Sequence, residues 1–337
     1  MSQQLEQRFV GALIGTFVGD ALGMPVEGWS WTRIAREWGE VREMLPARLG
    51  RGTYTDDTLL MIALAESLLA NQGRVVPEDL VRRFRAVYDP RRGFGAGMHR
   101  LVRLWEAGVP WDEAARSLFN GGSYGNGAAM RVAPVGVLYH QDPTEVYRAA
   151  VLQARVTHAH PLGQQGAALQ ALAVAQALRA SAHTFSPEQF LEDLEATLPA
   201  SAETFRRALM MAGELLDRWE DRGLVVRKLG NRSAAHRSVP TAIFAFLTHW
   251  TSFEEALVYA VSLGGDTDTL AAMTGAIAGA FHGVHAVPPR WWDALEQGEK
   301  GRDYVVTLGE RLYHLWRTHG IARKQGNDST SPSLGAH

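Results

Sequence analysis

The sequence predicts an all-α protein that folds as one compact helical domain. Apolar residues recur at helical spacing along most of the chain, and no segment alternates apolar and polar residues between hairpin turns. No sharp change in composition and no internal repeat marks a domain boundary. The length of 337 residues is compatible with one large core or with two modest ones. The prediction of a single domain therefore depends on the uniform helical pattern.

The helical pattern is clearest near the start of the chain. Phe9, Leu13 and Phe17 are spaced four residues apart, and an aliphatic residue follows each of them. Such a wide apolar stripe is typical of a buried helix, so we predict a helix over 9–22. The same pattern predicts helices over 59–69, 164–180, 204–219, 240–249, 254–263 and 267–282. Less regular patterns predict amphipathic helices near 78–88, 98–107, 112–119, 144–155 and 302–318.

Two segments depart from the helical pattern. The short apolar run at 224–226 is the one place where a strand is tolerated. The polar end of the chain, 324–337, has few residues that could join a core and is predicted to be disordered. The predicted folded domain therefore covers 1–323.

Two of the predicted helices carry small residues at every fourth position. Glycine occupies positions 11, 15, 19 and 23, and a second stripe consists of Ala271, Gly275, Gly279 and Gly283. Because glycine inside a helix costs about 1 kcal/mol relative to alanine, the repeat needs a reason. We hypothesise that the two helices cross closely in the centre of the core. The alternative is that each stripe packs against some other helix.

The composition excludes several classes of function. A net charge of -2 gives no electrostatic reason to expect nucleic acid or an anionic membrane as partner. The absence of cysteine excludes disulfides, thiolate metal sites and cysteine nucleophiles. No signal-peptide pattern is present and no apolar run approaches the roughly 20 residues that span a bilayer, so we expect a cytoplasmic protein. Any metal must be held by oxygen or imidazole, which favours magnesium, manganese or calcium over zinc.

Two acidic clusters directly precede predicted helices, at 54–58 and at 264–269. Threonine and aspartate are good N-cap residues, so both clusters have a purely structural interpretation. A helix has a single N-cap, however, and each cluster carries two aspartates. If the clusters meet in space, repulsion among four carboxylates must raise their pKa values or recruit cations. Oxygen ligands of this kind suit a pair of hard divalent ions.

Several loop residues could face the same site. Glu27 lies between a proline and a glycine and is free to point inward, or it is an ordinary exposed loop acid. The glycine-rich stretches 93–97 and 121–127 could let backbone N–H groups approach a phosphate, or they are ordinary turns. Tyr124 could stack on a base or ribose. His158 and His160 lack the spacing of a helical metal-binding pair, which favours hydrogen-bonding or packing roles.

Taken together and in this order, five stretches resemble the ADP-ribosylglycohydrolase family: 15–27, 55–58, 125–131, 157–158 and 264–269. The resemblance implies an orthogonal helical bundle with a binuclear magnesium or manganese centre. It implies metal-ligand positions at Thr55, Asp56, Asp57, Asp266, Asp268 and Thr269. Glu27 matches the glutamate that faces the scissile ribose and can shift to control substrate entry. Glu27, Asp57 and Asp268 are therefore the expected catalytic residues.

The resemblance also implies how the substrate is held. The loops at 93–97 and 123–127 match those that hold the diphosphate, ribose and adenine, and His158 matches a substrate-contacting histidine. The expected substrate-binding residues are Gly95, Gly97, Ser123, Tyr124, Gly125, Asn126 and His158.

The implied function is metal-dependent hydrolysis of an ADP-ribosyl linkage on a protein or small molecule, with two divalent cations, Mg²⁺ or Mn²⁺, and ADP-ribose as product. The alternative is a non-catalytic relative that binds ADP-ribose or serves structurally, as crystallins of the family do. The linkage stays open among arginine, serine, base and small-molecule acceptors. Segment 230–238 either lines the acceptor side or is a surface turn. The oligomeric state is open as well, with a monomer favoured.

Overall fold

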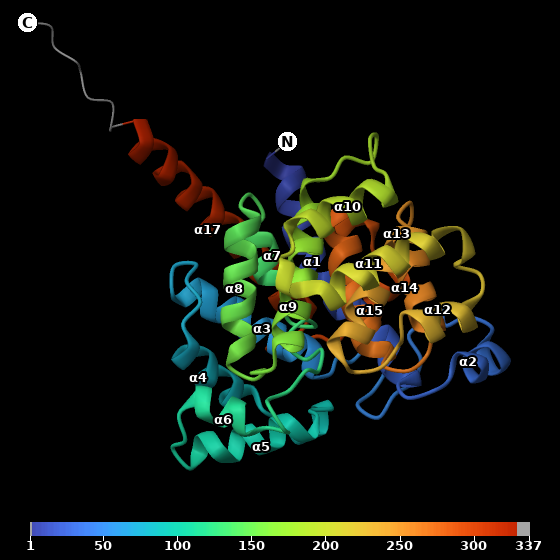
Figure 1. Ribbon diagram of the computed structural model, residues 1–337, viewed down its shortest axis with the longest axis horizontal. Coiled ribbons are helices and arrows are strands. Elements are labelled where there is room, and N and C mark those ends of the chain that lie inside the picture. The colour runs from blue at the N-terminus through green and yellow to red at the C-terminus, as the bar shows by residue number, and fades with distance from the viewer. Residues whose placement is uncertain (1, 329–337) are drawn as a thin grey trace, which may run out of the picture.

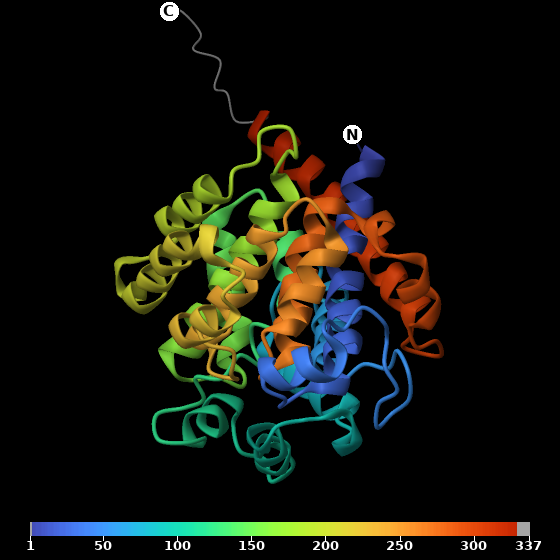
Figure 2. The same cartoon turned by 90° about the vertical axis from the view of Figure 1, so that its right-hand side faces the viewer.

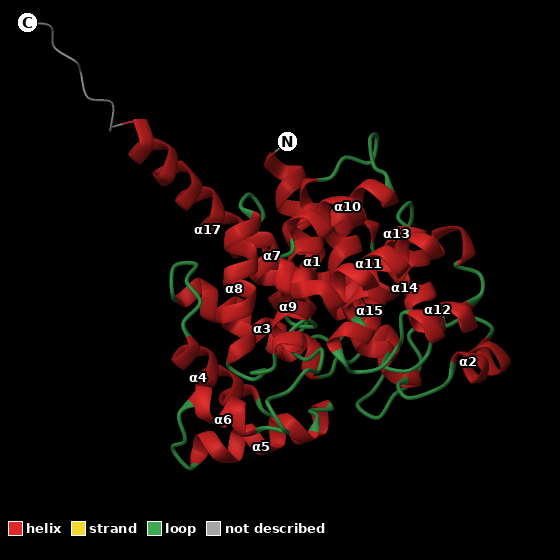
Figure 3. Ribbon diagram, in the orientation of Figure 1, coloured by secondary structure: helices red, strands yellow, loops and turns green. Residues whose placement is uncertain are grey.

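The computed structural model describes residues 2–328, with side chains described for 3–318. The described residues contain helices and no β-strand, which confirms the predicted all-α class (Figure 3). The α-helices are α1 (Ser2–Gly23), α2 (Trp31–Trp38), α3 (Asp56–Ala70), α4 (Pro77–Val87), α5 (Ala96–Glu106), α6 (Trp111–Ser117), α7 (Ala133–Leu138), α8 (Pro143–Arg155), α9 (Pro161–Arg179), α10 (Pro187–Thr197), α11 (Glu203–Leu215), α12 (Arg222–Lys228), α13 (Val239–Thr248), α14 (Phe253–Ser262), α15 (Thr267–His282), α16 (Pro289–Ala294) and α17 (Arg302–Asp328). Short 3-10 helices are η1 (Met24–Val26), η2 (Pro90–Arg92), η3 (Ala200–Ala202), η4 (Leu216–Arg218), η5 (Ala235–Arg237) and η6 (Val284–Ala286).

The strand tolerated at 224–226 is wrong, because these residues lie inside α12. The carboxylate of Asp221 accepts a hydrogen bond from the Leu224 amide at 2.8 Å and so caps the start of this helix. A run of three apolar residues is too short to distinguish a strand from a helix by periodicity. The side chain of Asp221 decides the outcome locally.

The helices α1 and α15 lie side by side in the centre of the protein (Figures 1 and 2). A Cβ atom added to Gly15 would stand 2.0 Å from the carbonyl oxygen of Gly275, and one added to Gly19 would stand 2.0 Å from that of Ala271. No side chain fits in such a space, so the two backbones are in direct contact. The hypothesis that the two small-residue stripes face each other is confirmed.

The remaining helices surround this central pair as one compact domain. In Figure 2 the helices α5 and α6, in teal, form a layer below the lower ends of the central helices. The N-termini of α3 and α15 and the C-terminus of α1 approach one another, since the Thr267 hydroxyl donates to the Gly23 carbonyl at 2.8 Å and the Thr55 amide donates to Asp20 at 3.0 Å. These helix ends carry both acidic clusters.

The first helix is more apolar than we expected from the sequence, in which no apolar run approached the length that spans a bilayer. Length and composition alone would let residues Gln3–Val26 cross a bilayer, yet 94% of the apolar window is buried inside the protein. Such burial is what a central core helix requires, so the segment is weak support for a membrane span. The cytoplasmic location stays a prediction.

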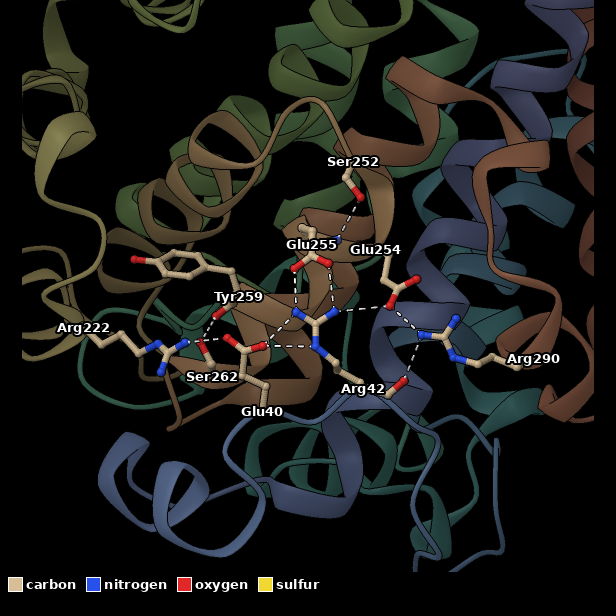
Figure 4. Close-up of polar contacts among 9 residues, drawn as sticks. All are labelled: Glu40, Arg42, Arg222, Ser252, Glu254, Glu255, Tyr259, Ser262 and Arg290. Carbon is tan, nitrogen blue, oxygen red and sulfur yellow. Dashed lines mark hydrogen bonds and ion pairs between the residues drawn. The ribbon is translucent and has the colours of Figure 1, made fainter.

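An ion-pair network ties the loop after α2 to the neighbouring helices (Figure 4). The guanidinium of Arg42 donates to both carboxylate oxygens of Glu255 at 2.8 Å and to Glu40 at 2.8 Å. Glu40 also accepts from Arg222 at 2.9 Å, while Arg290 bonds Glu254. Each half-exposed pair contributes about 0.2–1 kcal/mol. Together the pairs hold the loop that leads from α2 to the acidic cluster at the start of α3.

At the end of the chain, α17 continues to Asp328, past the predicted domain boundary at 323. The rest of the predicted tail, 329–337, lies outside the described residues. The helical pattern of 302–318 therefore marks only the first part of a longer helix.

Candidate active site

Asp20 organises the first acidic cluster from a distance. Its buried carboxylate accepts hydrogen bonds from the amides of Thr55 and Thr58 at 3.0 and 3.1 Å. It also accepts from the hydroxyls of the same threonines at 2.8 and 2.6 Å. Asp20 thereby satisfies amide groups at the N-terminus of α3 that a local cap would otherwise bind. Its oxygens are occupied by these donors, so it acts as a support for the cluster.

The interpretation of both acidic clusters as helix caps is wrong for the two residues at the N-cap positions. Thr55 stands at the N-cap of α3 and Asp266 at the N-cap of α15, and neither side chain caps its helix. At α15 the carboxylate of Asp266 instead accepts from the side-chain amide of Asn126 at 2.7 Å. The aspartates of the clusters therefore need another role.

The carboxylates of the two clusters come together in two groups. Oxygens of Asp20, Asp57 and Asp268 lie within 4.8 Å of one another, and so do oxygens of Glu27, Asp266 and Asp268. Asp268 belongs to both groups. One buried oxygen of Asp57, Oδ1, has no hydrogen-bond partner among the described residues. A buried carboxylate oxygen without a donor is costly, and a cation in this place would remove that cost.

Burial and mutual repulsion raise the pKa values of these acids. Burial is the first cause for Asp56, whose pKa rises to about 8, with the charges of Asp20, Asp266 and Glu27 adding to it. The pKa values of Asp57 and Asp268 are raised well above their ordinary range by burial and by neighbouring carboxylates. The arrangement therefore disfavours a fully ionised cluster without cations.

Glu27 differs from the other acids because its side chain is exposed. Partial loss of water around its carboxylate raises the pKa of Glu27, and the negative charge of Asp266 raises it further. The positive charge of Arg48 lowers this pKa. The loop that carries Glu27 is fixed to the second cluster by its backbone, since the Gly28 amide donates to the Gly265 carbonyl at 2.8 Å. A short connection thus places an exposed acid beside a buried acidic cluster.

The acidic cluster forms one end of a cavity of about 650 Å³, within the size range of small-molecule sites. Apart from Thr55, whose hydroxyl donates to Asp20 and lies 3.3 Å from an oxygen of Asp57, the predicted site residues all line this cavity. Those residues are Glu27, Asp56, Asp57, Gly95, Gly97, Ser123, Tyr124, Gly125, Asn126, His158, Asp266, Asp268 and Thr269.

The two glycine loops form another part of the wall. A Cβ atom added to Gly95 would meet nothing within 4 Å, so this position opens onto free space at the N-terminus of α5. The first amides of a helix have no partner within the helix and carry partial positive charge. On the other loop, the ring of Tyr124 is half exposed and packs edge-on against His160 with 5.5 Å between ring centres. Phosphate-type and base-type contacts are thus available in one cavity.

His158 is buried behind the glycine loop. Burial, together with the charge of Arg131, lowers the pKa of His158 to about 3, so the ring is neutral near pH 7. Its Nδ1 is 2.7 Å from the hydroxyl oxygen of Thr157. Arg131 in turn donates to Thr157 and to Gln153 at 2.9 and 2.8 Å. This network presents a neutral imidazole to the cavity.

The segment 230–238 contributes to the cavity rather than forming a detached turn. Arg232, Ser233 and Ala234 line the wall. The side chain of Arg237 faces away, with its guanidinium donating to backbone carbonyls of α12. The geometry therefore supports the interpretation that segment 230–238 lines the site, and it does not support the interpretation as a surface turn.

Sequence reasoning left some wall and support residues unassigned. Asp20, an acid that could belong to the site, and Arg131 lie within the stretches 15–27 and 125–131, but their burial and their partners are visible only in the structure. Phe119 lines the cavity with its ring 60% exposed and its backbone in the left-handed region, at a φ of 48°. A large aromatic residue two positions before a pair of glycines could have suggested this position. Nothing in the sequence singles out Arg48.

Comparisons with known proteins agree with this site. The model of the ADP-ribosylglycohydrolase family matches residues 1–322. The chain is 39% identical to the ADP-ribosylhydrolase ARH3 of Bos taurus, over 92% of this chain and 93% of the bovine protein. ARH3 of Homo sapiens is 39% identical, over 92% and 94% of the two chains.

A solved structure described as an ADP-ribosylglycohydrolase-related protein complex superposes with a TM-score of 0.73 and 30% identity. The match covers 93% of this chain and 99% of that one. The helical fold, the acidic cavity and these matches over nearly the whole chain lead to one conclusion: the protein belongs to the ADP-ribosylglycohydrolase family and is an ADP-ribosyl hydrolase.

Proposed function

We propose that the protein cleaves ADP-ribose from a protein or small-molecule acceptor with two divalent cations, Mg²⁺ or Mn²⁺, held by the acidic cluster. The observation that carries the proposal is the sharing of Asp268 between two groups of carboxylates. An aspartate shared in this way would supply oxygen ligands to both of two divalent ions. The partner-free oxygen of Asp57 supports the same conclusion.

The donor set fits hard divalent ions. The residues that would hold them are Thr55, Asp56, Asp57, Asp266, Asp268 and Thr269, which supply only oxygen atoms. Asp56 lines the cavity but belongs to neither of the two close groups. When bound, the ions would supply Lewis-acid activation of water and of ribose hydroxyls.

The chain's own groups prepare the rest of the reaction. Cleavage of a ribosyl bond passes through a cationic centre, which neighbouring carboxylates such as Asp57 and Asp268 would stabilise. Glu27, exposed on the cavity wall, would exchange a proton with water or with the leaving group. The raised pKa of Glu27 suits either direction of transfer.

Replacement of Glu27 by Gln is expected to reduce kcat by roughly 10²–10⁴-fold, the usual contribution of a general acid or base. The affinity for Mn²⁺ should change far less, because the glutamine keeps the size of the side chain and the aspartates are intact. Single-turnover rates and Mn²⁺ titrations of the same variant measure the two effects. An equal loss of metal binding would instead make Glu27 a direct ligand.

Removal of the metal is expected to destabilise the protein increasingly as pH rises. The folded-state pKa values of the cluster are raised, so the contribution of these acids to the stability of the metal-free protein is fully present below about pH 4 and is lost as pH rises through about 8, the pKa of Asp56. Bound cations favour the ionised form and reverse this loss. An ion at 100 times its Kd adds about 2.7 kcal/mol.

Thermal unfolding with Mg²⁺ and with chelator, at pH 5 and at pH 8, measures this effect. The increase in Tm caused by Mg²⁺ should be clearly larger at pH 8, with ionic strength matched by sodium chloride. The same increase at both pH values would show that the buried carboxylates do not control metal binding.

The proposed function is tested by release of free ADP-ribose from arginine-linked and serine-linked substrates. Reactions contain Mg²⁺, Mn²⁺ or chelator. Release that stops with chelator and returns with added metal is the expected result, and the faster linkage names the acceptor class. Release at the same rate in chelator would overturn the metal-dependent mechanism.

A further inference from the structure

One arginine on the cavity wall, Arg232, has no side-chain partner among the described residues. The guanidinium of Arg232 makes no hydrogen bond and no ion pair with the side chains described between 3 and 318. The other arginine on the wall, Arg131, is buried and donates to Gln153, Thr157 and the Gly127 carbonyl. Among the arginines that line the cavity, Arg232 alone is available to a ligand.

Backbone hydrogen bonds fix where Arg232 lies along the cavity. The carbonyl of the preceding residue, Asn231, accepts from the Asp266 amide at 2.8 Å. The carbonyl of the following residue, Ser233, accepts from the Asn126 amide at 2.8 Å. Arg232 therefore stands between the acidic end of the cavity and the glycine loop that carries Tyr124.

We propose that Arg232 binds the diphosphate of the ADP-ribosyl group. The inference rests on the proposed function, which places the ribose that is cleaved at the acidic cluster. The aromatic rings of Tyr124 and Phe119 at the cavity wall suit the adenine at the other end of the group. The diphosphate lies between ribose and adenine, as Arg232 lies between the acids and Tyr124.

The chemistry of the side chain matches this ligand. A guanidinium offers a planar fork of donors that binds phosphate oxygens in pairs. Its positive charge attracts the negatively charged diphosphate at a point away from the acidic end of the cavity, where the cations are proposed to bind. The free amides at the start of α5, on the wall beside Gly95, add partial positive charge. Arg232 is thus suited to act as a substrate-binding residue that contacts the diphosphate.

Calorimetric titration with ADP-ribose and with adenosine tests the proposal on the full-length protein in Mg²⁺ buffer. Arg232→Ala should weaken ADP-ribose binding on the order of tenfold, the size expected for a charged hydrogen bond. Adenosine, which has no phosphate, should bind both proteins equally. Arg232→Lys should recover part of the lost affinity. The control variant is Arg227→Ala, which removes an exposed arginine outside the cavity wall and should bind as wild type.

Unchanged ADP-ribose affinity in Arg232→Ala would overturn the proposal. If that variant also changed the ratio of rates on arginine-linked and serine-linked substrates, Arg232 would belong to the acceptor side. Equal weakening of adenosine would mean a general disturbance of the cavity and would likewise contradict a phosphate contact. Because binding is measured without turnover, a failure of metal-dependent hydrolysis would leave this result interpretable on its own.

Discussion

Asp268→Asn is expected to abolish activity and metal binding together. Asp268 is the acid that both carboxylate groups share, so its replacement removes a negative charge from each of them at once. Metal activation of a reacting group is worth several kcal/mol, and a loss of about 4 kcal/mol corresponds to a rate roughly 10³-fold lower. The measurement is kcat/KM for ADP-ribose release at saturating Mg²⁺, alongside Mn²⁺ affinity.

The fold should survive this change. Asp268 is buried beside Asp57 and Asp266, and removal of one charge lowers the repulsion among them. We therefore expect the metal-free variant to unfold at a temperature equal to or above that of the metal-free wild type. Thermal unfolding in chelator makes this comparison and separates a site defect from a folding defect. Activity near the wild-type level in a well-folded variant would contradict the role given to Asp268.

Gly15→Ala is expected to cost about 3 kcal/mol of unfolding free energy or more, the upper part of the range for overpacked cores. The added Cβ atom would stand 2.0 Å from the Gly275 carbonyl oxygen, and backbone atoms cannot rotate away. The helices α1 and α15 would have to separate, and the acidic clusters at their ends would separate with them. Denaturant unfolding measures the loss, and reduced ADP-ribose release should accompany it.

A matched control for this variant is Gly213→Ala, which lies inside the helix α11. The nearest atom to its added Cβ would be a Leu191 methyl group at 3.6 Å, an ordinary contact. Because alanine restricts the unfolded chain more than glycine does, this change should stabilise the protein by about 0.4–1 kcal/mol. Similar stability of the two variants would contradict the close crossing.

Long amphipathic elements were predictable because their periodicity extends over several turns. The helix predicted over 267–282 is observed over the same residues, and that predicted over 144–155 begins one residue earlier, at Pro143. Five helices were missed, namely α2, α7, α10, α12 and α16. Of these, α7 and α16 have six residues each, too few for a period to be recognised. The first helix begins at Ser2 rather than at residue 9, because its first turns are polar and break the apolar stripe.

The acidic part of the candidate site was predictable because its aspartates are close to one another in the sequence. Asp56 with Asp57, and Asp266 with Asp268, form local patterns that mark both ends of the acidic cluster. The role of Asp20 was not predictable, because its partners Thr55 and Thr58 follow it by 35 and 38 residues. The approach of Arg48 to Glu27 likewise depends on the tertiary path of the loop between α2 and α3. Such contacts appear only once the helices are packed.

Titration of the wild-type protein with Mn²⁺, with free Mn²⁺ followed by electron paramagnetic resonance, tests the central claim most directly. The account predicts two bound ions per chain, both displaced by Mg²⁺, and neither ion bound at comparable affinity in Asp268→Asn. Fewer than two ions in the active wild-type enzyme, or two ions retained after loss of Asp268, would contradict a binuclear centre built on this shared aspartate.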